Sequence, residues 1–232
     1  IIVINNASSD GTIEYLNNFD FINVINNYEN LGYPIAINQG IKAAKGDYIC
    51  LLNNDVVLTG SWAEGLLEAL DHDKDNGLTG PVTNSVSGLQ IDPAAIYNDI
   101  KMMHKYAARV REERRRSWVN IGRIAFVCAM IKKEVINKIG GLDEIFSPGN
   151  FEDDDFCLRA QIAGFKTVIA QDVFIHHYGS KSFKAEGENK YQERIKINLE
   201  KFIDKAKEYP YAVMGMSALL STTMENMKLV ID

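Results

Sequence analysis

Short apolar segments and helical patterns alternate through the first half of the chain, and this order limits the possible folds more than any other feature. Segments with the pattern of buried strands cover residues 1–4, 21–25 and 47–52, and helical patterns follow them over 12–19, 33–44 and 62–70. Strands and helices in this βαβαβ order form a parallel sheet with helices on both faces. We therefore predict an α/β fold with a mixed, mainly parallel, Rossmann-like sheet flanked by helices.

The second half of the chain has longer helical patterns. We predict a long helix over 92–116, a helix over 152–163 and a charged amphipathic helix over 188–208. Strands are predicted over 125–131, 167–170 and 173–177. The simplest organisation is one domain over residues 1–185, followed by a C-terminal helical extension over 186–232.

Length and composition are those of a globular protein with a large core. The 232 residues are 46% hydrophobic and 24% charged, and the net charge of −6 argues against non-specific nucleic-acid binding as the main function. No apolar segment approaches the roughly 18 residues of a membrane-spanning helix. The three cysteines show no spacing typical of a metal site or a disulfide.

Polar clusters follow the first and third predicted strands, at residues 5–10 and 53–55. Ligands of parallel sheets bind at the carboxyl ends of the strands, so both clusters should line one crevice. Asp55, beside Asn53 and Asn54, offers the oxygen ligands that Mg²⁺ or Mn²⁺ prefers. The same residues also fit an Asx-turn that merely ends a strand, and the residues alone leave both interpretations open.

Four consecutive acids at 152–155 open a predicted helix. Neighbouring like charges repel one another, and the helix dipole offsets only part of that cost. The segment is therefore either a solvated acidic turn or a site that uses the acids. His176 and His177 end the predicted strand 173–177 and alternate between its two faces, so one of them should face the same crevice.

Seven segments occur in an order that is typical of one enzyme family. They are IIVINNASSDGT at 1–12, NYENLGYPIAINQG at 27–40, LLNND at 51–55, GPVTN at 80–84, GGLD at 140–143, NFEDDDFCLR at 150–159 and HHYGSKSF at 176–183. Each motif is weak alone, but the ordered set resembles the family 2 glycosyltransferases with the GT-A fold, in the rhamnosyltransferase-like branch. The resemblance runs from residue 1 to about residue 183.

This resemblance implies a metal site and a catalytic base. The family's metal motif, often Asp-x-Asp, matches 53–55 with only Asp55 kept as an acid, and its later metal-binding histidine matches His177 better than His176. Its Glu-Asp motif matches Glu152 and Asp153, which makes Asp153 the base and Glu152 its support. Asp155 would stabilise the start of the helix or touch the acceptor, and Asp154 would be the most dispensable acid.

The resemblance also implies two substrates. The nucleotide-sugar donor is expected to contact Asn5, Asp10, Asn30, Gly32, Asn38, Asn53, Asn54 and Asn84. The acceptor is expected to contact Trp118 and Arg159. The implied reaction is inverting transfer of a sugar from a UDP- or dTDP-sugar to a saccharide or lipid-linked acceptor in cell-surface polysaccharide synthesis, with Mn²⁺ or Mg²⁺ as cofactor.

The expected location is the cytoplasm, including the inner face of the membrane. The arginines of 109–116 fit either a solvated helix face or contact with an anionic acceptor or membrane surface. No nucleic-acid partner is expected, and self-association as a homo-oligomer is a further option.

Two departures from the family pattern affect these expectations. Asn5 stands where the family usually has an acid that helps to hold the nucleotide base, so the nucleotide preference is open. The family's first strand and its Pro-x-Tyr-type turn are absent, so we expect the chain as written to be poorly active by itself. The main alternative function is a non-catalytic nucleotide-sugar or glycan-binding module with a degenerate GT-A fold. A nucleotidyltransferase, which also uses a parallel sheet and a metal, is a weaker one.

Overall fold

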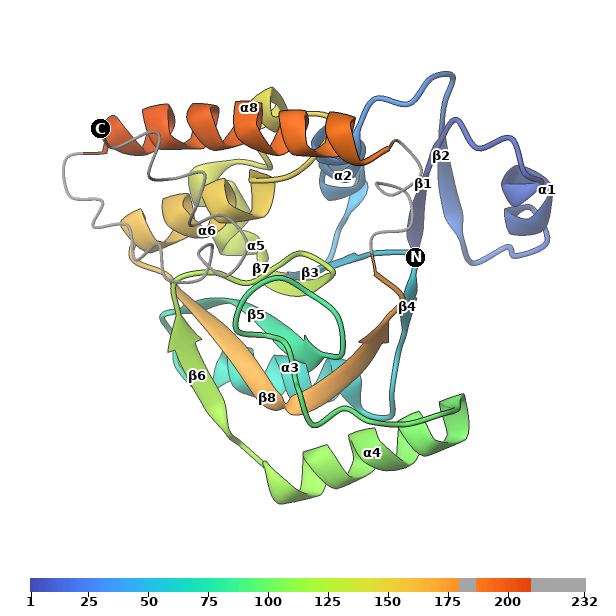
Figure 1. Ribbon diagram of the computed structural model, residues 1–232, viewed down its shortest axis with the longest axis vertical. Helices are drawn as coiled ribbons and strands as arrows, with labels where there is room; N and C mark the ends of the chain where they lie inside the picture. Colours follow the sequence, from blue (N-terminus) through green and yellow to red (C-terminus); the bar gives the residue numbers. More distant parts are fainter. Residues whose placement is uncertain (180–186, 210–232) are drawn as a thin grey trace.

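The computed structural model describes residues 1–179 and 187–209, and its centre is a six-stranded mixed sheet (Figure 1). Five strands follow one another in the order β3-β7-β5-β8-β4, and β6 also pairs with β8. Their bounds are β3 Tyr48–Leu52, β4 Val56–Val57, β5 Asn76–Thr83, β6 Trp118–Ile121, β7 Cys128–Lys132 and β8 Lys166–His177. The predicted α/β class with a mixed sheet is confirmed.

The direction of the strands brings several polar segments to one edge of the sheet. β5 runs parallel to β8, and β7 runs antiparallel to both β5 and β3. Strands β3, β5 and β8 therefore end on the same side. The segments that follow them begin at Asn53, Asn84 and Tyr178.

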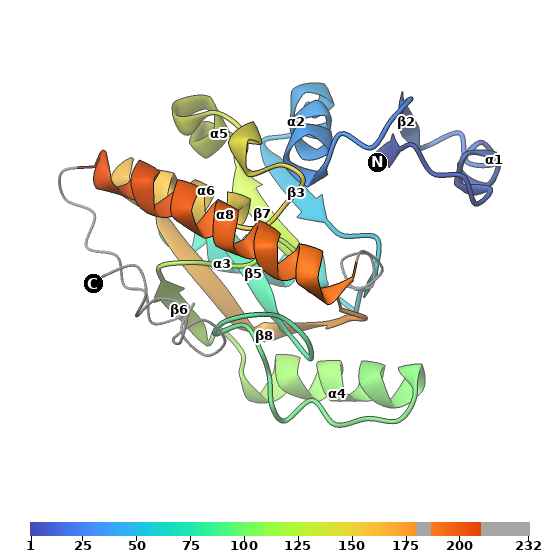
Figure 2. The same ribbon diagram turned by 45° about the horizontal axis from the view of Figure 1, so that its top comes forward.

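Helices cover both faces of this sheet (Figures 1 and 2). Leu66 and Ala69 of α3 (Trp62–Asp71) pack against Met130, Ala170 and Val173, whereas Phe156 and Ala160 of α6 (Glu152–Ile162) belong to the core on the opposite face. The remaining helices that contact the sheet or its neighbours are α2 (Tyr33–Ala43), α4 (Ile100–Glu113), α5 (Lys133–Ile139) and the 3-10 helix η1 (Glu144–Phe146).

The long helix α8 (Glu188–Lys207) lies over α6 and η1 and forms an outer layer on that face (Figure 1). Its Leu199 and Phe202 are buried with Phe146 and Phe151, so it packs on the segment that leads into α6. The predicted helix over 188–208 is confirmed, and the rest of the predicted extension from residue 210 lies outside the described residues.

The first two strands do not join the central sheet as predicted. β1 (Ile2–Asn6) and β2 (Asn23–Asn27) pair in parallel as a separate two-stranded sheet, with the short helix α1 (Thr12–Leu16) between them. In the part of the chain that the structure describes, neither strand has a ladder to β3. Figure 2 shows this small sheet and α1 projecting beside α2.

Two local predictions about the second half were wrong, and each error has a physical cause. The helix predicted from residue 92 begins only at Ile100, because Pro93 disfavours a helical Asp92 and Asp99 caps the helix with a side-chain bond to the amide of Met102. The two strands predicted over 167–177 are one strand, β8, whose pairing with β5 shifts between Ala170 and Phe174. The polar residues at this irregularity interrupt the apolar pattern in the sequence, so the single strand was predicted as two.

Within the described residues, none of the helices combines the length and the apolar content that crossing a bilayer requires.

Candidate active site

The four acids at the start of α6 are buried, so the interpretation as a solvated turn was wrong. Glu152, Asp153 and Asp154 are each 8% exposed, and Asp155 is 1% exposed. The two residues before them, Asn150 and Phe151, have positive φ angles of 78° and 73°, which turn the chain sharply into the helix. Such burial of four acids requires partners.

Arg123 is the main partner of two of these acids. Its Nη2 lies 2.8 Å from Oδ2 of Asp153, and its Nε lies 2.9 Å from Oδ1 of Asp154, although this second contact lacks hydrogen-bond geometry. The Asp153 side chain also accepts the amide proton of Asp154 at 3.0 Å. The side-chain oxygen Oε2 of Glu152 is buried and has no hydrogen-bond partner among the described residues.

Burial and mutual repulsion alter the acidity of this group. Burial, together with the charge of Asp153, raises the pKa of Glu152 to about 8 and that of Asp154 to about 8. Burial opposes the charge of Arg123, but the carboxylates of Asp153 and Asp154 outweigh it and raise the arginine pKa. Three acids thus share one cation in a site of low polarity.

Asp155 belongs to a different set of contacts. It pairs with Nε of Arg159 at 2.7 Å and with Nζ of Lys205 from α8 at 3.0 Å. The other nitrogens of Arg159 donate to the carbonyls of Ile139 and Gly141. These contacts favour a structural role for both Asp155 and Arg159, which is one of the two roles predicted for Asp155 and differs from the acceptor contact predicted for Arg159.

Helix α8 also holds the loop that leads into the acids. The amide of Asn198, which is 1% exposed, donates to the carbonyls of Phe146, Gly149 and Asn150 at 2.9, 3.0 and 3.2 Å. On its other side, the loop carbonyl of Pro148 accepts the amide proton of Tyr33 at the start of α2. The positive-φ turn is therefore fixed from two helices.

Asp55 and His177, the two residues predicted to bind a metal, lie next to each other and form a second centre. Nε2 of His177 lies 3.2 Å from Oδ1 of Asp55, and Nδ1 lies 2.6 Å from the carbonyl of Ser85. A carbonyl only accepts, so Nδ1 carries the hydrogen and the lone pair of a neutral ring points from Nε2 toward the carboxylate. Either a proton on Nε2, which makes an ion pair with Asp55, or a metal ion between or beside the two groups satisfies this arrangement.

The separation fits a divalent ion. Ligands of an octahedral Mg²⁺ lie about 2.0–2.1 Å from the metal, so two ligands at right angles are about 3 Å apart. The 3.2 Å between Nε2 of His177 and Oδ1 of Asp55 matches this spacing. Within residues 1–179 and 187–209 no third His, Cys, Asp or Glu completes a cluster, so amide oxygens, water or substrate would supply the other ligands.

The side chain of Asn84, which was predicted to contact the donor, binds the backbone of His177 and so positions it. Its side chain donates to the carbonyl of His177 at 3.1 Å and accepts the amide proton of His177 at 2.8 Å, as a neighbouring strand would. His176 lies on the other face and bonds through Nδ1 to the hydroxyl of Tyr97 at 2.6 Å. The alternation predicted for the two histidines is confirmed.

The other predicted donor residues fall into separate groups. Asn5 is 3% exposed and donates to the side chain of Asn26, whereas Asp10 is exposed and accepts from the amide and hydroxyl of Thr12. Asn30 accepts from the amide of Gly32, whose φ of 84° suits glycine. None of these groups has a described hydrogen bond or ion pair to Asp55 or His177.

Two further donor predictions concern amides with different surroundings. The side chain of Asn38 is fully engaged with Leu142 and Glu144, which favours a structural role. Asn53 and Asn54 stand next to Asp55; the Asn53 side chain is half-buried and that of Asn54 is exposed, so both are accessible to a ligand there.

Trp118 lies apart from the carboxylates. Its Nε1 donates to Asp172 at 3.1 Å, and its ring packs on His72. Asp172 is fully buried and also binds Arg111 and the amide of Arg116. These contacts give Trp118 a role in joining α4, β6 and β8.

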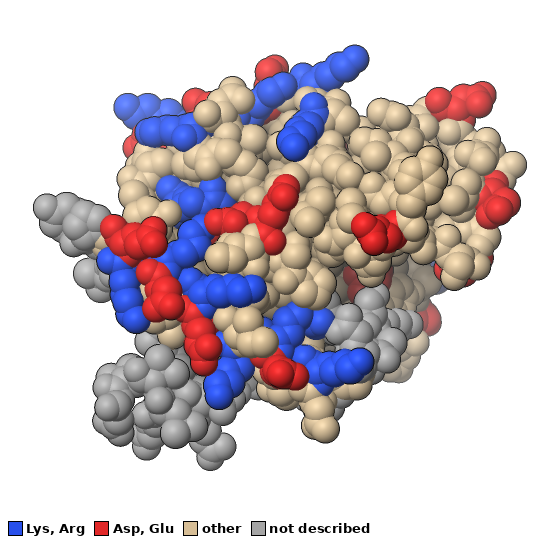
Figure 3. All heavy atoms as spheres, turned by 90° about the horizontal axis from the view of Figure 1, so that it is seen from above, with Lys and Arg blue, Asp and Glu red and all other residues tan. Residues whose placement is uncertain are grey.

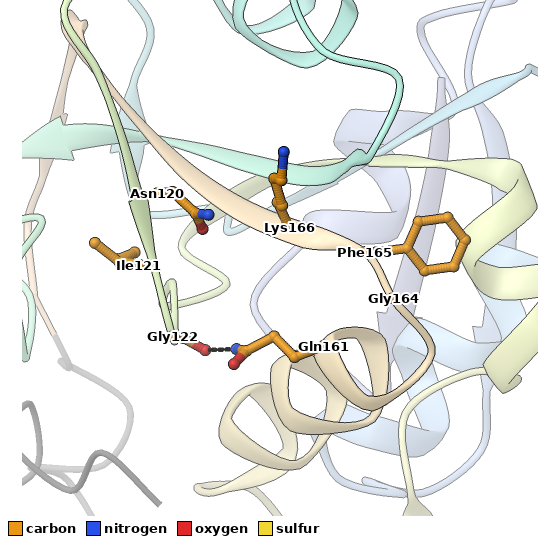
Figure 4. Close-up of a pocket in the computed structure, with 7 residues that line it drawn as sticks. All are labelled: Asn120, Ile121, Gly122, Gln161, Gly164, Phe165 and Lys166. Carbon is orange, nitrogen blue, oxygen red and sulfur yellow. Dashed lines mark hydrogen bonds between the residues drawn. The ribbon is translucent and has the colours of Figure 1, made fainter. Parts of the chain in front are cut away.

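A hollow of about 470 Å³ lies away from these centres. Figure 4 shows it between β6, the C-terminal end of α6 and the start of β8, with Gln161 pointing at the carbonyl of Gly122. The acids lie at the opposite end of α6, so this hollow has no part in their chemistry.

The surface above α8 carries charges of both signs, whereas the lobe of β1, α1 and β2 shows acids on a mostly uncharged surface (Figure 3). Residues 1–41 contain no lysine or arginine.

Sequence reasoning did not identify Arg123, Ser85 or Asn198. Arg123 stands alone between a glycine and an isoleucine, and no periodicity or motif marks it. Asn198 interrupts the apolar face of α8 as a buried amide, which was the one available signal.

Comparison with known proteins places these residues in a family context. The curated relatives include the uncharacterized protein y4gI of Sinorhizobium fredii, 22% identical over 78% of this chain and 21% of that protein. They also include the poly-beta-1,6-N-acetyl-D-glucosamine synthase of Staphylococcus aureus, 38% identical over 33% of this chain and 19% of that enzyme. The chain thus spans about a fifth of the length of these relatives.

Two solved structures share the fold. The mannosyltransferase PcManGT of Pyrobaculum calidifontis, in complex with GDP-Man and Mn²⁺, superposes with a TM-score of 0.61 at 17% identity, over 91% of this chain and 55% of that one. GalNAc-T7 with UDP, GalNAc and Mn²⁺ superposes with a TM-score of 0.57 at 16% identity, over 76% and 37%. Both comparisons support the GT-A fold.

The model of the family "Glycosyl transferase family 2" matches residues 1–140, which is more than half of the chain. The chain therefore belongs to glycosyl transferase family 2.

Proposed function

We propose that this chain carries the catalytic site of an inverting, metal-dependent glycosyltransferase that moves a sugar from a nucleotide-diphosphate donor to a saccharide or lipid-linked acceptor. The observation that carries the proposal is the pairing of two centres at one edge of the sheet. One is a metal-type pair, Asp55 and His177, and the other is a buried group of acids around Asp153. A module that only binds its ligand has no need for a crowded buried base.

Asp55 and His177 would hold Mn²⁺ or Mg²⁺ next to the donor diphosphate. When bound, the ion would stabilise the negative charge that develops on the departing diphosphate. The fold neighbours with GDP-Man or UDP and Mn²⁺ support this choice of cofactor and donor class. Asn53 and Asn54 stand where their amides could contact the same donor, while Asn5 and Asp10 would contact the nucleotide base or ribose.

Asp153 would act as the base. Its carboxylate takes the proton of an acceptor hydroxyl as the acceptor oxygen forms a bond to the anomeric carbon. The bond from that carbon to the diphosphate oxygen breaks in the same displacement, and the nucleoside diphosphate leaves. Glu152 and Asp154, whose pKa values are raised, stay largely protonated near neutral pH and limit the repulsion on Asp153.

The finer assignments also belong to this proposal. They are a UDP- or dTDP-sugar as donor, a rhamnosyltransferase-like specificity, cell-surface polysaccharide as product, and the cytoplasm or inner membrane face as location. The partial match to a polysaccharide synthase supports the product class. We further propose that α8 belongs with the catalytic domain, since its Asn198 and Lys205 hold the loop and helix that carry the acids.

A donor panel tests the proposal. The full chain is heated with UDP-, dTDP- and GDP-sugars, each with and without Mn²⁺, and the melting temperature is recorded. We expect one nucleotide class to raise the melting temperature only with Mn²⁺, and release of its sugar in the same mixture. A Mn²⁺-dependent shift without sugar release would favour the binding-module alternative, and no shift with any donor would contradict both.

A further inference from the structure

The proposed reaction assigns no role to Arg123, which contacts two of the buried acids. It lies in the segment between β6 and β7, and its side chain is 17% exposed. Nε and Nη2 face Asp154 and Asp153, and Nη1 donates to the carbonyl and the hydroxyl of Ser87 at 3.1 and 3.3 Å. One planar guanidinium therefore joins α6 to the loop after β5.

The loop after β5 reaches from Arg123 to the metal-type pair. Asn84 binds the backbone of His177, the carbonyl of Ser85 fixes its ring, and Ser87 receives Arg123. The four-residue segment 84–87 therefore contacts the metal-type pair at one end and, through Arg123, the acids at the other end. Contacts run without a break from Asp55 to Asp153.

Asp153 lies among other acids, so its position depends on its contact with Arg123. The titratable groups around it are Glu152, Asp154 and Cys157 on its own helix, Tyr33 from α2, and Arg123. Arg123 is the cation that pairs with Asp153 among the described residues. Without it, the buried Asp153 carboxylate would lose the contact that fixes its orientation and would have no cationic partner among the described residues.

We propose that Arg123 is a positioning residue that orients the Asp153 carboxylate toward the acceptor, and that couples it through Ser87 to the loop that holds His177. This inference rests on the proposed function. Lysine cannot reproduce the role fully, since an ammonium has no planar fork that reaches two carboxylates and a loop at once.

Kinetics of three variants test the inference. Arg123→Gln removes the charge, Arg123→Lys keeps it without the fork, and Lys45→Gln removes a charge at an exposed position as the matched control. We expect Arg123→Gln to lower kcat by tenfold or more, with donor binding unchanged. The acceptor KM should change less than kcat, because Arg123 contacts the base Asp153. Arg123→Lys should recover part of the rate.

A second measurement separates positioning from loss of folding. Guanidinium added to Arg123→Ala should restore part of the rate, and it should not do so for Lys45→Gln. Wild-type kcat in Arg123→Gln, in a preparation whose wild type transfers sugar, would overturn the inference and leave the proposed function standing. If the wild type transfers no sugar from any donor, the proposed function fails first and the inference fails with it.

Discussion

The contact between α8 and the loop before the acids gives a sharp test of how the site is built. Asn198 is 1% exposed, and its amide nitrogen serves three carbonyls, those of Phe146, Gly149 and Asn150. Replacement by alanine leaves these carbonyls without that donor, next to a turn with two positive φ angles. A buried polar group without a partner costs about 1–3 kcal/mol, so we expect Asn198→Ala to lower the free energy of unfolding by about 2–4 kcal/mol.

Urea unfolding of Asn198→Ala and of Asn189→Ala measures this cost directly. Asn189 is exposed on the same helix, and its replacement should change stability by less than about 0.5 kcal/mol. Asn198→Asp should destabilise further than alanine, since a carboxylate would face the same carbonyls without a donor. We also expect Asn198→Ala to lower kcat, because the loop presents Asp153. Equal stability of the two alanine variants would refute the claim that α8 holds this loop.

Three further predictions concern other parts of the site. The raised pKa values of Glu152 and Asp154 mean that the folded state keeps protons which the unfolded chain has lost, so their contribution to stability is full below about pH 4 and is lost as the pH rises through about 8. Asp154→Asn should therefore come closest to the wild type in urea unfolding near pH 4 and exceed it increasingly toward pH 9; a wild type that gains on the variant between these values would contradict this. Asp55→Asn should abolish the Mn²⁺-dependent thermal shift with donor but leave the metal-free melting temperature unchanged, and a retained shift would place the metal elsewhere. Trp118→Phe should cost about 1–3 kcal/mol in urea unfolding through the lost bond to Asp172, with an unchanged acceptor KM; a raised KM at unchanged stability would restore the acceptor role.

The fold class and the two centres could be predicted because their signals are local. Apolar strands that end in polar residues marked Asp55 and His177, and the ladder of the sheet brings both to the same edge. The acids at 152–155 were visible as an unusual run, but their burial was not, because it depends on α8 and on Arg123.

What the sequence could not indicate are contacts between distant segments. Arg123 and Asp153 are 30 residues apart, and Asn84 and His177 are 93 apart. The amides of Asn38 and Asn84 were predicted to contact the donor because they lie in segments that resemble the family's motifs. In the folded chain, these side chains instead form hydrogen bonds with backbone groups of Leu142 and His177 that lack a partner in secondary structure.

The central claim is that Asp153 is the base of a sugar transfer, and one comparison tests it most directly. Sugar transfer and Mn²⁺-dependent donor binding are measured for the wild type and for Asp153→Asn, which keeps the shape and the contact geometry toward Arg123. General-base catalysis is worth about 10²–10⁴ in rate, so turnover should fall by that factor while the donor Kd stays the same. Turnover near the wild-type rate in Asp153→Asn, with donor binding intact, would contradict the account.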